Sequence, residues 1–190
     1  LPAAPEKRQE EIMVGIRNIG LHIPQLRVAR ELLNKSWGAP GGRGERSLAN
    51  HDEDSVTMAV EAVLRCMKGA PGAGFDGLYF ATTTAPYAEK LNAALIAAVA
   101  DMPEDDVATA DFTGSLRCGT AALKSALDAV GAGTARNLIV AAADTRVAEP
   151  GSPLENCLGD AAAALWISGE DLIATIDAVF SLSLEFTDVW

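Results

Sequence analysis

Hydrophobic positions along the chain follow two patterns, one with the spacing of strands and one with the spacing of helices. Short apolar runs typical of strands occupy residues 12–20, 77–82, 106–112, 136–144 and 159–168. Apolar positions three and four residues apart predict helices over residues 29–37, from Asp52 or Asp54 to about Met67, over about 88–100 and over about 116–131. The predicted order is therefore β-α-α-β-α-β-α-β-β.

This alternation predicts an α/β fold with a mixed, mostly parallel sheet of five strands and helices on its faces. Residues 136–144 are almost entirely apolar, as expected for a strand buried on both faces. The last two strands leave no room for a helix between them, so we expect them to pair antiparallel. Residues 39–47 are a glycine-rich loop without a phosphate-loop pattern, and residues 173–186 form a further strand or a crossover.

Composition and charge narrow the possible functions. The chain is 49% hydrophobic and 22% charged, which indicates a protein that forms a core. Its net charge is −11, and an acidic body repels phosphate backbones, so nucleic acid is not an expected partner. The first 50 residues are basic, with 8 basic and 5 acidic side chains. This basic cluster is either a solvated surface or a contact for an anionic ligand, and consists of Arg27, Arg30, Lys35, Arg43 and Arg46.

No run of 18 apolar residues occurs, so we expect no membrane association. The first residues, LPAAPEKRQEE, lack the apolar core of a secretion signal, and we expect a cytoplasmic protein. The 3 cysteines form no CxxC pair, and the spacing of His22 and His51 does not suggest a metal site. Reduced thiols, no metal and no tightly bound cofactor are the expectation.

The strand at 106–112, followed by small residues and a helix, is the strongest candidate site. A thiol in the first turn of such a helix lies among free backbone N–H groups, which lower its pKa and favour a nucleophilic thiolate. Cys118 lies about there, and Gly114 and Gly119 on either side allow close backbone approach. The alternative is that Cys118 is a small buried packing residue, and spacing alone leaves both interpretations open.

Several segments, in order and spacing, resemble one group of enzymes. The segments are VGIRNIGLHIPQLRVARELL, GERSLANHDEDSVTMAVEAVLRCM, FDGLYFATTTAPYAEKLNAALIA, DFTGSLRCGTAALKSAL and NLIVAAADTRVAEPGSPLENCLGDAAAALWI. Together they resemble the N-terminal half of thiolase-fold condensing enzymes. The most similar members are HMG-CoA synthase, the initiating ketoacyl-ACP synthases, and the thiolase subunits that work with a zinc-finger partner.

The resemblance implies the N-terminal half of a thiolase-like fold, βαβαβαββ, within a five-layer architecture in which helix 116–131 is buried. Residues 1–12 would be an N-terminal tail and residues 13–190 the half-domain. The second half, which supplies active-site His and Asn residues in this family, has no counterpart here. We therefore expect a fragment or one member of a split pair.

The resemblance also implies chemistry on acyl-CoA thioesters, with coenzyme A as part of the substrate. Cys118 would carry the acyl group while a C–C bond is made or broken. Arg117 would contact a CoA phosphate. Thr83, Glu89 and Glu155 would bind substrate or support the site, whereas Asp144 and Arg146 are expected to form a structural pair.

Two departures favour an alternative function. The family nucleophile aligns with Leu116, and Cys118 lies two residues further on, roughly 200° around a regular helix. Thr83 stands where HMG-CoA synthases carry a general-acid Glu, which argues against a true HMG-CoA synthase. The chain could therefore be a non-catalytic thiolase-fold subunit that supports an active partner, or an α/β domain without acyl chemistry.

Assembly is the last expectation from the resemblance. We expect a homodimer through the strand near 106–112, and a partner subunit with a zinc-finger or OB-fold is possible within this family.

Overall fold

The structure is a computed structural model that describes residues 13–40, 42–70 and 73–184. Its strands are β1 Gly15–His22, β2 Leu26–Ala29, β3 Glu45–Leu48, β4 Gly77–Ala81, β5 Ala108–Phe112, β6 Asn137–Asp144, β7 Ala161–Ser168 and β8 Ala174–Thr175. Its helices are α1 Arg30–Ser36, α2 Ser55–Met67, α3 Asn92–Val99, α4 Cys118–Gly131 and α5 Pro153–Cys157. The predicted N-terminal tail, residues 1–12, lies outside the described residues.

The main sheet has the strand order β5-β4-β6-β7-β1-β8. Strands β5, β4 and β6 are parallel to one another. Strand β7 pairs antiparallel with both β6 and β1, and β8 pairs antiparallel with β1. The mixed sheet and the antiparallel pair β6–β7 confirm the prediction. The expectation of a mostly parallel sheet is wrong, because the reversed strand β7 lies between β6 and β1, and the short β8 adds a sixth strand.

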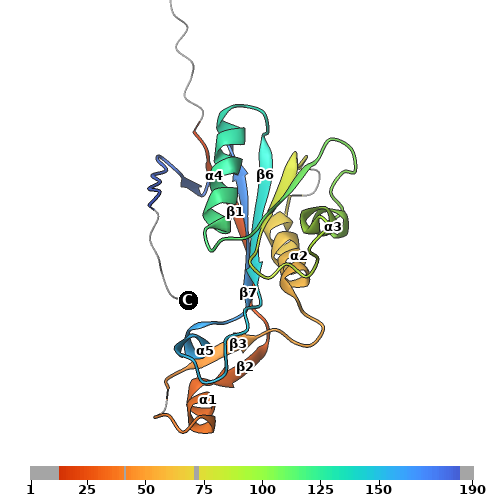
Figure 1. Ribbon diagram of the computed structural model, residues 1–190. Helices are drawn as coiled ribbons and strands as arrows, with labels where there is room; N and C mark the ends of the chain where they lie inside the picture. The colour runs from red at the N-terminus through yellow and green to blue at the C-terminus, as the bar shows by residue number, and fades with distance from the viewer. Residues whose placement is uncertain (1–12, 41, 71–72, 185–190) are drawn as a thin grey trace, which may run out of the picture.

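Helices cover both faces of this sheet, as predicted (Figure 1). Helices α2 and α3 pack on one face around a core that includes Phe80, Ile139 and Trp166. Helix α4 packs on the other face with Leu138, Val140 and Ile167. The described residues thus form three layers. Helix α4 is buried on its sheet side only, because Thr120, Lys124 and Asp128 on its outer side are exposed.

Helix α2 begins at a capping box. The Asp54 side chain accepts a hydrogen bond from the Thr57 backbone N–H at 2.8 Å, and the Thr57 hydroxyl accepts one from the Asp54 N–H at 2.7 Å. The pair satisfies two otherwise free N–H groups at the helix start. Asp54, rather than Asp52, is therefore the N-cap.

A small module lies at one end of the sheet and consists of β2, β3, α1 and α5 (Figure 1). Strands β2 and β3 pair antiparallel, with α1 between them in the chain, so the end of the predicted loop 39–47 is a strand. The sequence did not predict this strand, because GERS is rich in charged and turn-forming residues. The strand is also only four residues long and pairs outside the main sheet. Helix α5, between β6 and β7, was also not predicted, since a five-residue helix carries too little periodicity to detect.

Substitution of Gly20 by Ala is expected to destabilise the fold. A Cβ atom at Gly20 would overlap the carbonyl oxygen of Ala62 and the backbone of Cys66 in α2. Overpacking against backbone costs about 1–3 kcal/mol of unfolding free energy, measurable by urea denaturation. Gly119→Ala is the matched control, because no atom lies within 4 Å of a Cβ there. Equal stability of the two variants would contradict close packing of α2.

Candidate functional site

The site is built where three parallel strands end together. The loop after β4 leads to α3 on one face of the sheet, and the loop after β5 leads to α4 on the opposite face. Adjacent strands whose connections leave on opposite faces form a topological switch point, where ligands of open α/β sheets bind. Strand β6 pairs with β4 and brings Asp144 to the same edge.

One carboxylate oxygen organises this edge. Oδ1 of Asp144 accepts hydrogen bonds from the Thr82 hydroxyl at 2.9 Å, the Thr83 N–H at 2.7 Å, the Thr83 hydroxyl at 3.1 Å and the Thr84 hydroxyl at 3.0 Å. The Thr84 hydroxyl also accepts from the Thr145 N–H at 3.0 Å. The ATTT segment is therefore clamped to the end of β6. Asp144 and Arg146 form no ion pair in the described part of the chain, so the expected pair is wrong.

A hollow of about 430 Å³ opens beside these threonines. It is lined by Thr83, Thr84, Gly114, Ser115, Leu116, Arg146 and Val147. Leu116 is 52% exposed, so an apolar side chain stands at the mouth of the site. Of the predicted site residues, only Thr83 lines this hollow.

Cys118 lies behind the hollow rather than in it. It is the first residue of α4, is 9% exposed, and packs in the core with Ala122 and Leu138. Burial and the nearby charge of Asp144 raise the pKa of the Cys118 thiol, although the backbone N–H groups of Gly119 and Cys118 act in the opposite direction. The expectation of a lowered pKa is therefore wrong. Desolvation outweighs the helix N-terminus because the thiol faces the apolar core.

The other predicted residues are dispersed. Arg117 donates hydrogen bonds to the Leu182 carbonyl and the Ser181 hydroxyl, both at 3.2 Å. Glu89 is exposed and does not line the hollow. Glu155 lies in the small module, where its carboxylate accepts from the Trp37 indole N–H at 2.9 Å and the Gly151 N–H at 2.8 Å.

A second hollow of about 530 Å³ adjoins the first, and both are lined by Arg146 and Val147. Its walls also include Arg46, Glu155 and Asp160. Arg46 is only 8% exposed; its terminal nitrogen donates to the Glu155 carbonyl at 2.9 Å, and its Nε has no hydrogen-bond partner. Of the basic cluster noted in the sequence, Arg46 is thus a buried cation in a concave wall.

The described residues contain no group of three or more His, Cys, Asp or Glu side chains placed to hold a metal ion. No helix in the described ranges has the length and apolar character needed to cross a membrane.

Sequence reasoning missed two features of the site. Asp144 was expected to pair with Arg146, whereas it binds threonines 60–62 residues away in the chain. The run of three threonines after an apolar strand was the available signal, since such a run offers many donors to one acceptor. The adjoining hollow depends on Asp160 and Arg46, which are 114 positions apart in the printed sequence. The basic cluster included Arg46, but no local pattern linked it to Asp160.

The order in which cysteines react follows from this geometry. Iodoacetamide is expected to label exposed Cys157 first and Cys118 more slowly. Cys66 should react slowest, because burial raises the pKa of its thiol to about 11. Asp144→Asn removes a negative charge that raises the pKa of Cys118, so the pH profile of Cys118 labelling should move to lower pH. Mass spectrometry measures each rate.

Cys66 is the internal control, because its pKa is raised by its own burial and not by Asp144. An unchanged Cys118 profile in Asp144→Asn, or fastest labelling of Cys118 in the unmodified chain, would contradict this account of the thiol.

Comparison with known proteins identifies the group to which this architecture belongs. No family model matches the chain. It is 32% identical over 185 residues to the hydroxymethylglutaryl-CoA synthase of Methanocella arvoryzae, covering 93% of this chain and 53% of that protein. It is 34% identical over 184 residues to the enzyme of that name from Thermococcus sibiricus, covering 93% and 52%. The chain thus spans about half the length of these relatives.

Solved structures have the same fold. MvaS in complex with 3-hydroxy-3-methylglutaryl coenzyme A matches with a TM-score of 0.78 and 22% identity, over 84% of this chain and 40% of that one. A 3-oxoacyl-(acyl-carrier-protein) synthase III matches with a TM-score of 0.74 and 23% identity, over 82% and 50%. The chain therefore has the fold of the N-terminal half of the thiolase-fold condensing enzymes, and over that half its sequence is similar to the hydroxymethylglutaryl-CoA synthases of this superfamily.

Proposed function

We propose that the chain is the acyl-CoA-binding half of a thiolase-like enzyme that makes or breaks a C–C bond in an acyl-CoA thioester. The observation that carries the proposal is the pair of adjoining hollows at the strand ends, with Arg146 in the wall of both. Each has the volume of a typical ligand pocket. We call the two adjoining hollows together the groove, and its two parts suit a ligand with chemically different ends.

The two hollows differ in chemistry, and the difference matches the two ends of an acyl-CoA. Arg46 and Arg146 line the second hollow and would bind phosphate oxygens through guanidinium donors. The first hollow, with Thr83, Thr84 and the residues preceding α4, would receive the thioester. The relatives named as hydroxymethylglutaryl-CoA synthases and the coenzyme A complexes of the fold support this substrate class.

A second candidate concerns the nucleophile. Cys118 faces the core with a raised pKa, and Leu116 stands in the hollow instead. These observations favour the alternative that this half binds acyl-CoA without forming an acyl-enzyme and supports an active partner. Catalysis through Cys118 would require the start of α4 to rearrange, so that the thiol leaves the core cluster.

Two further parts of the proposal concern the cellular location of the protein and its partner subunit. Cys66, Cys118 and Cys157 are all free, which suits a cytoplasmic protein, the location we propose. A zinc-finger or OB-fold subunit remains a candidate active partner, and its co-purification with the tagged chain would test this.

Replacement of Arg146 by Gln is expected to weaken acetyl-CoA binding about tenfold, because a hydrogen bond to a charged group is worth about 1.5 kcal/mol or more. Arg146 makes no hydrogen bond within the described residues, so the fold should tolerate the change. Isothermal titration measures the affinity. Mass spectrometry after incubation in a Cys157→Ala background should show no acetyl group on Cys118.

Arg43→Gln is the matched control, because it removes the same charge from an exposed residue that lines neither hollow. Equal affinities of the two variants, or no acetyl-CoA binding by the unmodified chain, would reject the proposed substrate. An acetyl group on Cys118 that is lost in Cys118→Ala would favour the catalytic candidate.

We also propose a homodimer through β5, which ends the strand order of the main sheet. The Ala108 N–H and the Phe112 carbonyl bond toward β4 and its loop, so the alternate residue Thr109 directs its N–H to the open edge. Thr109→Pro should therefore convert a dimer into a folded monomer, since proline is tolerated at a strand edge. Light scattering measures the mass; a monomer before substitution would refute the dimer.

A further inference from the structure

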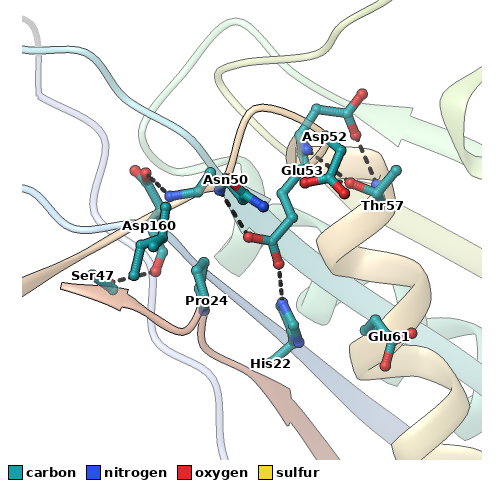
Figure 2. A network of polar contacts seen from close by, with 12 residues as sticks. His22, Pro24, Ser47, Asn50, Asp52, Glu53, Thr57, Glu61 and Asp160 are labelled. Carbon is teal, nitrogen blue, oxygen red and sulfur yellow. Dashed lines mark hydrogen bonds and ion pairs between the residues drawn. The ribbon is translucent and has the colours of Figure 1, made fainter.

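The small module is joined to the main sheet by a strap, which we define as residues 47–54, the last two residues of β3 and the loop that leads to α2. Figure 2 shows two carboxylates that hold this strap, Asp160 and Glu53. Both anchor it at one corner of the sheet, where His22 of β1 pairs with Ala162 of β7 and Asp160 immediately precedes β7. The strap is therefore fastened to the two neighbouring strands β1 and β7.

The first anchor is Asp160, which is 6% exposed. Its Oδ2 accepts a hydrogen bond from the Ala49 N–H at 2.7 Å. Its carbonyl accepts from the Ser47 hydroxyl at 2.6 Å, and its N–H donates to the Ser47 carbonyl at 3.2 Å. These three bonds fix the strap immediately after Arg46.

The second anchor is the pair of Glu53 and His22. Oε1 of Glu53 lies 2.8 Å from Nε2 of His22, and Oε2 accepts from the Asn50 N–H at 2.8 Å. The Asn50 N–H holds the pKa of Glu53 below its ordinary value against the opposing effect of burial, with a further contribution from His22. Glu53 is therefore ionised at neutral pH and joins the strap to the end of β1.

The strap forms one wall of the second hollow, whose lining includes Leu48, Ala49 and the adjacent Arg46. Neither Glu53 nor His22 lines that hollow. They border instead a separate apolar hollow between α2 and α3, lined also by Val60, Leu95 and Val99. Any effect of this pair on a ligand beside Arg46 must therefore pass through the backbone of the strap.

We infer that Glu53, held by His22, is a positioning residue for the anion-binding end of the groove, because it fixes the strap that contains Ala49 and directly follows Arg46. The inference rests on the proposed function for its ligand, coenzyme A. Loss of the Glu53 carboxylate frees the Asn50 N–H and unfastens the strap from β1. The strap is then held by the three Asp160 bonds alone, and this weaker support lets Arg46 sample orientations in which its guanidinium does not meet a phosphate. Ligand affinity therefore falls without any change in the lining residues.

The test compares coenzyme A binding to the full chain and its Glu53→Ala and Glu53→Gln variants by isothermal titration at neutral pH. Glu53→Ala is expected to weaken binding about tenfold, the effect of one lost charge-assisted contact. Glu53→Gln keeps an acceptor for the Asn50 N–H and should restore most of the affinity. His51→Ala, in the same strap but exposed and not bonded to Glu53, is the matched control and should bind as the unmodified chain.

Hydrogen exchange of the Ala49 and Asn50 amides in the absence of ligand gives a second readout, which should accelerate in Glu53→Ala. His22→Ala keeps the bond from Asn50 and provides a milder variant if Glu53→Ala does not fold. Coenzyme A affinity equal to that of the unmodified chain in Glu53→Ala, or in His22→Ala if only that variant folds, would overturn the inference. No coenzyme A binding by the unmodified chain would reject the proposed function, and slow amide exchange in the variants would then reject the anchoring itself.

Discussion

The close approach of α2 to β1 and β7 is the constraint on which the rest of the structure depends. Gly20 has no side chain, so the backbone of α2 at Ala62 and Cys66 comes against the strand. The contact is reinforced where the Asn18 amide donates to the Cys66 carbonyl at 2.7 Å. The small side chains of Ala162 and Ala164 in β7 likewise allow α2 to approach the neighbouring strand closely. A larger residue at any of these points would lift the helix and lose close packing along its length.

Because α2 is held so closely, its N-terminal end can serve both parts of the groove. The Ser55 hydroxyl, in the first turn, donates to the Thr84 carbonyl at 2.8 Å and so reaches the threonines around Asp144. Glu53, two residues earlier, holds the strap that leads back to Arg46. One helix start thus connects the thioester end of the proposed groove with its anionic end, which explains how a rigid sheet can position a module made of short elements.

Packing on the opposite face of the sheet, between α4 and the strands, separates the hollow from Cys118, the thiol that the sequence pattern had placed at the site. Small residues at the start of α4 allow the helix to lie against β4 and β6, and this closeness directs Cys118 into the core. Leu116, still in the loop, remains at the surface. A hollow at the strand ends and a thiol buried away from it occur together, which is the arrangement that the proposed non-catalytic role requires.

The sequence by itself determined the five longer strands of the main sheet, the helices α2 and α4, and the antiparallel pair β6–β7, because each depends on residues close together in the chain. It limited the cap of α2 to Asp52 or Asp54, and the structure decided for Asp54. It also indicated the superfamily, through several segments whose order and spacing resemble those of its members. Only the tertiary structure decided that Asp111 of β5 caps α3, accepting from the Asn92 N–H at 2.8 Å and the Ala93 N–H at 2.7 Å. It likewise decided the pKa of Cys118, the threonine clamp on Asp144 and the buried place of Arg46. These properties depend on desolvation and on partners far away in the chain, and local periodicity carries no information about either.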